Sequence, residues 1–168
     1  PTRVGRLPAT SDFPTALAAW AIDRHTSEAD LQAIATHWRK QLLLSNQEYS
    51  DLQEILALHT SLGAWETLGV AKKKRLASAK RFSSALAILQ SEDRPMFVFV
   101  KRAIAQLVKT GLCPDPLLRG DDLVDLGIPP SEAIGTILEA LYDAQLEGGI
   151  RSREEAISFA KALIRDIF

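Results

Sequence analysis

Apolar residues recur at helical spacing along almost all of the 168-residue chain. In residues 27–44, for example, Leu31, Ala35 and Trp38 fall on one face of a helix. No alternation of apolar and polar residues extends far enough to indicate a strand, and the β-branched run at 98–100 lies inside a segment of helical period. The sequence therefore predicts an all-α protein, with antiparallel helices packed in a multi-helix array and no sheet.

Helix-start signals divide this pattern into segments. Ser45 with Glu48, and Ser152 with Glu155, have the spacing of a capping box. Ser91 is expected to cap a helix that starts there. We expect helices over residues 11–25, 27–44, 45–62, 70–90, 91–112, 117–127, 129–149 and 152–168.

The clearest boundary lies at residues 113–116, Cys-Pro-Asp-Pro, because proline and a preceding Gly111 both interrupt helices. We therefore expect two helical regions, residues 1–112 and residues 117–168.

A proline pair, Pro129 and Pro130, stands at the start of one predicted helix. Pro130 suits the first helical position, where its missing N–H costs nothing. Gly135, one turn further on, costs about 1 kcal/mol relative to alanine in a helix, so it predicts a close helix crossing.

Composition excludes several classes of protein. The chain is 46% hydrophobic with a net charge of −1, which is typical of a folded domain and not of a disordered one. Its one cysteine, Cys113, allows no internal disulfide and favours a reducing compartment. No apolar run is long enough to span a bilayer and no signal peptide is visible, so we expect a cytoplasmic protein without membrane contact.

Motifs for catalysis or metal binding are missing from the sequence. The three histidines, His25, His37 and His59, have no metal-ligand spacing, and no phosphate-binding glycine loop is present. Asp121 and Asp122 are interpreted as acids that interact favourably with a helix dipole. We expect no catalytic residue, no metal site and no cofactor in this chain.

The charges are distributed unevenly. Residues 72–109 hold ten basic and two acidic residues, whereas residues 1–71 have a net charge of −3 and residues 110–168 of −6. A basic middle suits the phosphates of RNA or DNA, because neutralising several phosphates releases counterions. At helical spacing Lys73, Lys80 and Arg81 are expected near one another, although an ordinary solvated helix face would explain the same run. The candidate phosphate-binding residues are Lys72, Lys73, Lys74, Arg75, Lys80, Arg81, Lys101 and Arg102.

A longer pattern lies in LLRGDDLVDLGIPPSEAIGTILEALYDAQLEGGIRSREEA, residues 117–156. It resembles the C-terminal region of bacterial tRNA nucleotidyltransferases, the CCA-adding and poly(A) polymerase-like class. Where that family often has Pro-Gly-Pro, this chain has Pro-Pro-Ser. The matching residues are Leu118, Gly120, Asp122, Leu123, Gly127, Pro130, Gly135, Leu138, Glu147, Gly149 (displaced by one position), Ile150, Ser152, Arg153, Glu154, Glu155 and Ala156.

The resemblance implies that catalysis and tRNA binding reside in different parts of the enzyme. In that family a separate N-terminal α/β head adds nucleotides with Mg²⁺ and ATP or CTP, and the helical body and tail hold the tRNA acceptor/T arm. Neither the head's Asp-x-Asp pair nor the nucleotide-selecting Glu-Asp-x-x-Arg motif is present here. We expect residues 1–112 to be body-like and residues 117–168 tail-like, in a C-terminal piece of such an enzyme or a headless relative.

The expected partners are tRNA or another structured RNA and the head domain. Arg151 and Arg153 are secondary candidates for RNA contact, because they stand at a helix start where backbone N–H groups favour phosphate. The alternative is a purely structural helical module, which packs on a head or forms a homodimer and has no affinity for RNA. Trp20, Trp38 and Trp65 provide apolar contact area for either role.

Overall fold

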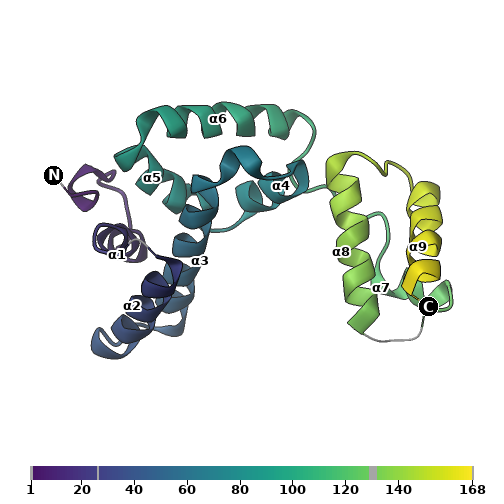
Figure 1. The fold of residues 1–168 in the computed structure, drawn as a ribbon, viewed down its shortest axis with the longest axis horizontal. Helices are drawn as coiled ribbons and strands as arrows, with labels where there is room; N and C mark the ends of the chain where they lie inside the picture. Colours follow the sequence, from purple (N-terminus) through teal and green to yellow (C-terminus); the bar gives the residue numbers. More distant parts are fainter. Residues whose placement is uncertain (1, 26, 129–131, 168) are drawn as a thin grey trace. The chain divides into compact units, whose positions relative to one another are not determined.

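The computed structural model describes residues 2–25, 27–128 and 132–167. Within these ranges every regular element is a helix, which confirms the predicted all-α class (Figure 1). No described helix has both the length and the apolar character needed to cross a bilayer. The elements are η1 (Val4–Arg6), α1 (Phe13–Ile22), α2 (Glu28–Gln41), α3 (Asn46–Gly63), η2 (Trp65–Thr67), α4 (Val70–Ser78), α5 (Phe82–Glu92), α6 (Arg94–Lys109), α7 (Gly120–Asp125), α8 (Glu132–Glu147) and α9 (Arg153–Ile167).

The chain divides into two compact units. The first runs from the N-terminal segment to Leu68 and from Leu76 to Lys109, and the second comprises Gly69–Arg75 and the chain from Thr110 onward. Helix α4 therefore contributes to both units. Compactness alone does not define independent domains, so the predicted regions 1–112 and 117–168 stay a prediction.

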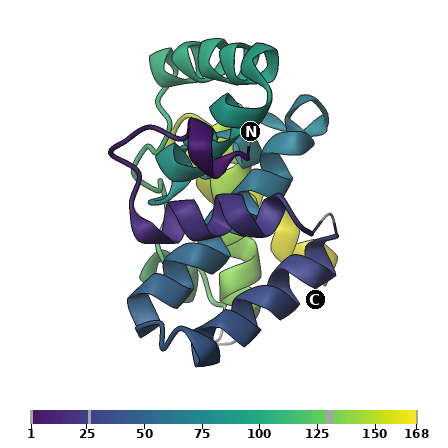
Figure 2. The same ribbon diagram turned by 90° about the vertical axis from the view of Figure 1, so that its left-hand side faces the viewer.

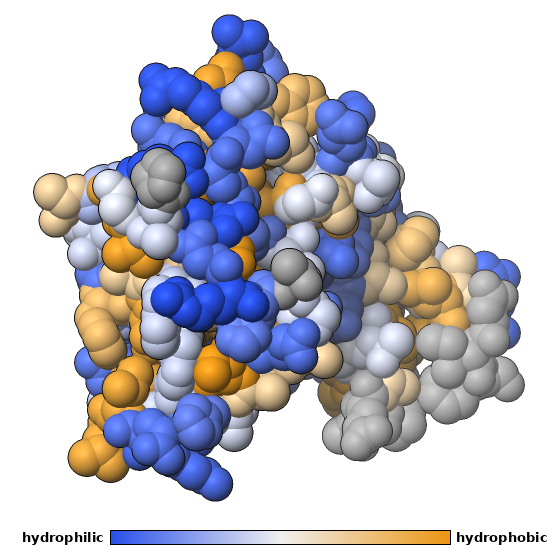
Figure 3. All heavy atoms as spheres, turned by 60° about the vertical axis from the view of Figure 1, so that its left-hand side comes forward, coloured by the Kyte–Doolittle hydropathy of each residue, from blue (hydrophilic) through white to orange (hydrophobic). Residues whose placement is uncertain are grey.

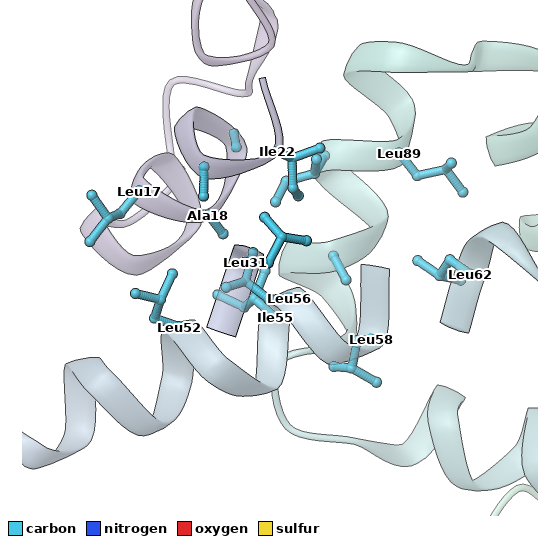
Figure 4. Close-up of a cluster of buried hydrophobic side chains, with 14 of the residues drawn as sticks. Leu17, Ala18, Ile22, Leu31, Leu52, Ile55, Leu56, Leu58, Leu62 and Leu89 are labelled. Atoms are coloured by element: carbon cyan, nitrogen blue, oxygen red, sulfur yellow. The ribbon is translucent and has the colours of Figure 1, made fainter. Parts of the chain in front are cut away.

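Helix α3 is the centre of the first unit, where it packs against α1, α2 and α5. Leu52, Ile55 and Leu62 of α3 are fully buried. Figure 4 shows apolar side chains of α1, α2, α3 and α5 pointing toward one another in this core. Each such side chain stabilises the fold by about 1.5–3 kcal/mol through burial.

Two aromatic contacts extend the core of the first unit. The rings of Trp20 and Trp38 stack with centroids 4.8 Å apart, which joins α1 to α2. Trp65 and Phe82 lie 6.5 Å apart, which joins η2 to α5. Helix α6 packs mainly on α5, and in Figures 1 and 2 it lies along the upper edge of the first unit.

The second unit has a smaller core between α7, α8 and α9. Leu123, Ile137 and Ala160 are almost completely buried there. The segment before α7 is tied to α8, because Tyr142 Oη donates to the carbonyl of Pro114 at 3.1 Å and Gln145 Nε2 donates to that of Asp115 at 2.8 Å. These bonds give two carbonyl groups of the non-helical segment the partners that a helix would otherwise supply.

The predicted helix-start signals were confirmed only in part. Ser45 and Glu48 form the predicted capping box, in which each side chain accepts from the backbone N–H of the other residue. The predicted cap at Ser91 was wrong, because Ser91 is buried inside α5, where its hydroxyl donates to the carbonyl of Ile88 at 2.7 Å. Helix α6 is instead capped by Asp93, whose carboxylate accepts from Met96 N at 2.9 Å.

Two further predictions were wrong. Residues 70–90 do not form one helix, because α4 ends at Ser78 and α5 begins at Phe82, which is buried beside Trp65. The predicted close crossing at Gly135 is not found among the described residues, none of which lies within 4 Å of the position that a Cβ would take there. Pro129 and Pro130 lie outside the described residues, and so does the predicted role of Pro130 at the first helical position.

Candidate nucleic-acid interface

Helix α4 carries the first four predicted phosphate-binding residues, and its lysines and arginine are good helix formers. Lys72 is exposed, Lys73 is half-buried and Lys74 is buried. Arg75 belongs to the second unit, where its Nε donates to Asp143 Oδ1 at 2.7 Å. Lys72 and Arg75 are therefore the two exposed cations of α4, and Arg75 is held by an ion pair.

Tyr142 holds Arg75 from a second direction, because the guanidinium lies 5.1 Å from the ring centroid. The Tyr142 hydroxyl also lies 3.3 Å from Cys113 Sγ. Burial and this contact raise the pKa of Tyr142 to about 12. The phenol therefore stays protonated and serves as a structural hydrogen-bond donor.

Arg81 follows the break between α4 and α5, and its side chain is only 13% exposed. One guanidinium nitrogen donates to both carboxylate oxygens of Asp12, at 2.8 and 2.6 Å. Another lies 3.8 Å from Asp51. Burial of Asp12 is more than offset by its hydrogen bonds with Thr15 and Arg81, so the pKa of Asp12 is lowered. Arg81 thus joins elements of the first unit and offers little surface to a ligand.

Lys80 is more accessible than its neighbour. Its side chain is 65% exposed, and its Nζ lies 3.4 Å from Asp51 Oδ1. An exposed pair of this length contributes little to stability, so Lys80 can exchange this carboxylate for another anion.

Lys101 and Arg102 lie on α6, and both are exposed. Lys101 Nζ is 5.7 Å from the ring centroid of Phe97 on the same helix. Within the described part of the chain, neither residue forms an ion pair with a carboxylate. Their charges are therefore not compensated locally.

Arg151 and Arg153 surround the start of α9. The Arg153 guanidinium pairs with Asp122 and also donates to the carbonyl of Leu117 at 3.3 Å. Hydrogen bonds from Arg153 and from the backbone of Arg119 lower the pKa of Asp122. These contacts give Asp122 a role beyond the dipole interaction that its position predicted.

The N–H groups at the start of α9 have partners of their own. Arg151 N donates to Glu155 Oε2 at 2.7 Å, and Glu155 N donates to the hydroxyl of Ser152 at 3.2 Å. The predicted Ser152–Glu155 cap thus forms in part, with Glu155 reaching the backbone one residue further back than expected. A phosphate would have to compete with this carboxylate.

The structure distributes the ten candidates over both units. Lys80, Arg81, Lys101 and Arg102 belong to the first unit, and the other candidates belong to the second. The expected cluster of Lys73 with Lys80 and Arg81 on one continuous helix was wrong, because the helix ends between them.

Sequence reasoning missed one residue on the surface of the second unit. Arg119 lines a hollow of about 350 Å³ with Arg75, Leu118, Leu138 and Tyr142. These residues come from distant parts of the chain, so local spacing held no signal for the hollow. Among the described residues, no three His, Cys, Asp or Glu side chains lie close enough together to hold a metal ion.

The fold and these surfaces define an all-α protein of two helical units whose basic residues are concentrated in α4, the start of α5, and α6. A stretch of 51 residues, 30% of this chain, is 43% identical to the CC-adding tRNA nucleotidyltransferase of Synechocystis sp. (strain ATCC 27184 / PCC 6803 / Kazusa). That stretch covers only 12% of the relative's length. No protein-family model matches the chain, and no solved structure matches it.

Proposed function

We propose that this chain is an RNA-docking part of a tRNA nucleotidyltransferase-like protein. It would hold the backbone of the tRNA acceptor/T arm so that a head domain can add nucleotides to the 3′ end. The similarity to a CC-adding tRNA nucleotidyltransferase carries the proposal, and the excess of basic residues between 72 and 109 supports it.

Nucleotide addition itself is assigned to the head. That reaction requires Mg²⁺ with ATP or CTP in the family that the sequence resembles. The contribution of this chain is positioning, because contacts to phosphate fix the orientation of an RNA without reading its sequence.

The exposure and ion pairs of the ten candidate residues allow their expected contributions to RNA binding to be ranked. Lys72, Lys101 and Arg102 are exposed, and we expect them to contribute most. Arg75 and Arg153 must first leave Asp143 and Asp122. Lys74 and Arg81 are the least accessible to phosphate.

A specific observation favours the second candidate function, a structural helical module without RNA affinity. Four of the ten predicted residues, Arg75, Lys80, Arg81 and Arg153, already contact carboxylates of the same chain. Intramolecular pairs of this kind stabilise packing and do not require a ligand. The module would then pack on a head or form a homodimer.

Filter binding with tRNA at two salt concentrations separates the two functions. The test variant is Lys72→Glu with Lys101→Glu and Arg102→Glu, and the control is Arg6→Glu with Lys40→Glu and Lys161→Glu. Both variants change the net charge equally at exposed positions. We expect the test variant to bind tRNA at least about tenfold more weakly than the control at low salt, with a shallower salt dependence.

Equal binding by the test and control variants would contradict the assignment of Lys72, Lys101 and Arg102 to RNA contact. A wild-type chain that has no affinity for tRNA but forms a stable dimer in light scattering would favour the structural module.

A further inference from the structure

Helix α6 differs from every other site considered for RNA contact. It contains no acidic residue between its first and last positions, but it carries four cations, Arg94, Lys101, Arg102 and Lys109. Among the described residues none of these four forms an ion pair, whereas Arg75, Arg81 and Arg153 do. The positive potential of α6 is therefore directed to solvent.

An exposed aromatic side chain lies on the same face of α6 as one of these cations. Phe99 is 46% exposed, and Arg102 and Gln106 follow it on the same face at intervals of three and four residues. The face is open because α6 packs mainly on α5, and Val100 is its one buried residue. In Figure 3, hydrophilic and apolar atoms are interspersed along the upper edge, at the height where Figure 1 places α6.

We propose that this face of α6 binds an unpaired nucleotide of RNA. The base stacks on the ring of Phe99, and Arg102, one turn further along the same face, contacts a flanking phosphate. The inference rests on the proposed function and deepens it, because it assigns to α6 the recognition of an RNA loop or single-stranded end.

Charge and aromatic exposure together favour this occupant. Phosphate contact alone requires only the cations, and a duplex keeps its bases stacked inside, where an exposed phenylalanine cannot reach them. An unpaired base offers a free face to an aromatic side chain, and backbone phosphates lie on both sides of it. An apolar protein partner is less well matched, because Phe99 and Val108 are the exposed large apolar residues of α6 among four cations.

Fluorescence anisotropy on the whole chain tests the proposal. The probes are a labelled single-stranded RNA of about twelve nucleotides and the duplex of the same sequence. Phe99→Leu removes the aromatic ring and keeps an apolar side chain. The matched control is Phe159→Leu, since Phe159 on α9 is 37% exposed. The charge variant is Lys101→Gln with Arg102→Gln, and thermal melting checks that every variant is folded.

We expect Phe99→Leu to weaken binding of the single strand about fivefold or more and to change duplex binding less than about twofold. Phe159→Leu should change neither, and the charge variant should weaken both. Single-strand binding that survives Phe99→Leu but not the charge variant would overturn the stacking contact and leave the proposed function standing. A chain that binds neither RNA would overturn both proposals. If that chain bound polyglutamate through Lys101 and Arg102, the surface would instead be a docking site for an acidic protein.

Discussion

At the scale of single residues, Leu43 combines backbone strain with exposure. Its φ is 53°, in the left-handed region, and its side chain is 86% exposed. It follows α2 in a glycine-type helix end, in which Leu44 N donates to the carbonyl of Arg39 at 3.1 Å. Burial of Leu44 holds this turn together although residue 43 is not glycine.

Leu43→Gly should therefore stabilise the protein. Removing the left-handed strain outweighs the greater freedom of glycine in the unfolded chain, so we expect the free energy of unfolding to rise by about 0.5–1 kcal/mol. Leu42→Gly is the control, because Leu42 has an ordinary φ of −96° and should lose stability on the same change. Urea denaturation measures both, and an equal loss in the two variants would contradict the role of strain.

Glu92 predicts a dependence of stability on pH. Its carboxylate accepts from Arg3 Nε at 2.5 Å and lies 2.6 Å from His59 Nε2. Burial raises the pKa of Glu92, but His59 and Arg3 together lower it by a larger amount. The pKa of Glu92 therefore lies below its ordinary value of 4.5. A lowered pKa in the folded state means that the stabilisation is complete above pH 4.5 and is lost as the pH falls through the folded pKa.

Glu92→Gln should cost about 1–3 kcal/mol at pH 7. Thermal melts from pH 7 to pH 3 should show that the difference from the wild type shrinks as the pH falls from about 4.5 through the lower pKa of the folded state, where the wild-type carboxylate becomes protonated. Glu66→Gln, at an exposed position, should leave the pH profile almost unchanged. A constant difference across the range would exclude Glu92 as the titrating group.

At the scale of elements, the positions of the helix ends determine which helix carries each basic residue of the segment 72–109. Helix α5 ends at Glu92, and α6 begins two residues later with Asp93 as its cap. This short connection allows α6 to pack on α5 and keep Phe99 and Arg102 on its open side. A change in the cap should therefore affect the geometry of the proposed RNA surface.

Asp93→Ala should destabilise the protein by about 1 kcal/mol, because Met96 N loses its acceptor. Asp93→Asn should cost much less, since asparagine caps equally well. Hydrogen exchange at the first turn of α6 should accelerate in the alanine variant alone. Equal exchange in both variants would show that the side-chain oxygen does not hold this helix end.

At the scale of the whole molecule, the described residues contain two separate apolar cores. One is built mainly from α1, α2, α3 and α5, and the other from α7, α8 and α9. Each unit therefore has its own source of stability. Substitutions in one core should act mainly on that unit.

Ile55→Ala and Leu123→Ala test this separation, because both side chains are fully buried, one in each core. Each should cost about 2–5 kcal/mol. Hydrogen exchange should accelerate in α3 for the first variant and in α8 for the second. Acceleration in both helices for either variant would indicate that the two units unfold as one.

Features that depend on neighbours along the chain could be predicted from sequence. The helical period determined the all-α class, because one apolar face of each helix must be buried whatever its partner. The Ser45–Glu48 cap followed from spacing, since both partners lie within one turn. The excess of basic residues between 72 and 109 is likewise a property of the sequence alone.

Which of those basic residues remain accessible was decided by tertiary structure. Arg81 is neutralised by Asp12, 69 positions away, and Arg75 by Asp143, 68 positions away. Local spacing cannot reveal such partners, because they meet only when distant helices pack and bury the surface between them. For the same reason only the folded chain shows that Arg102 keeps its charge on the same face of α6 as an exposed Phe99.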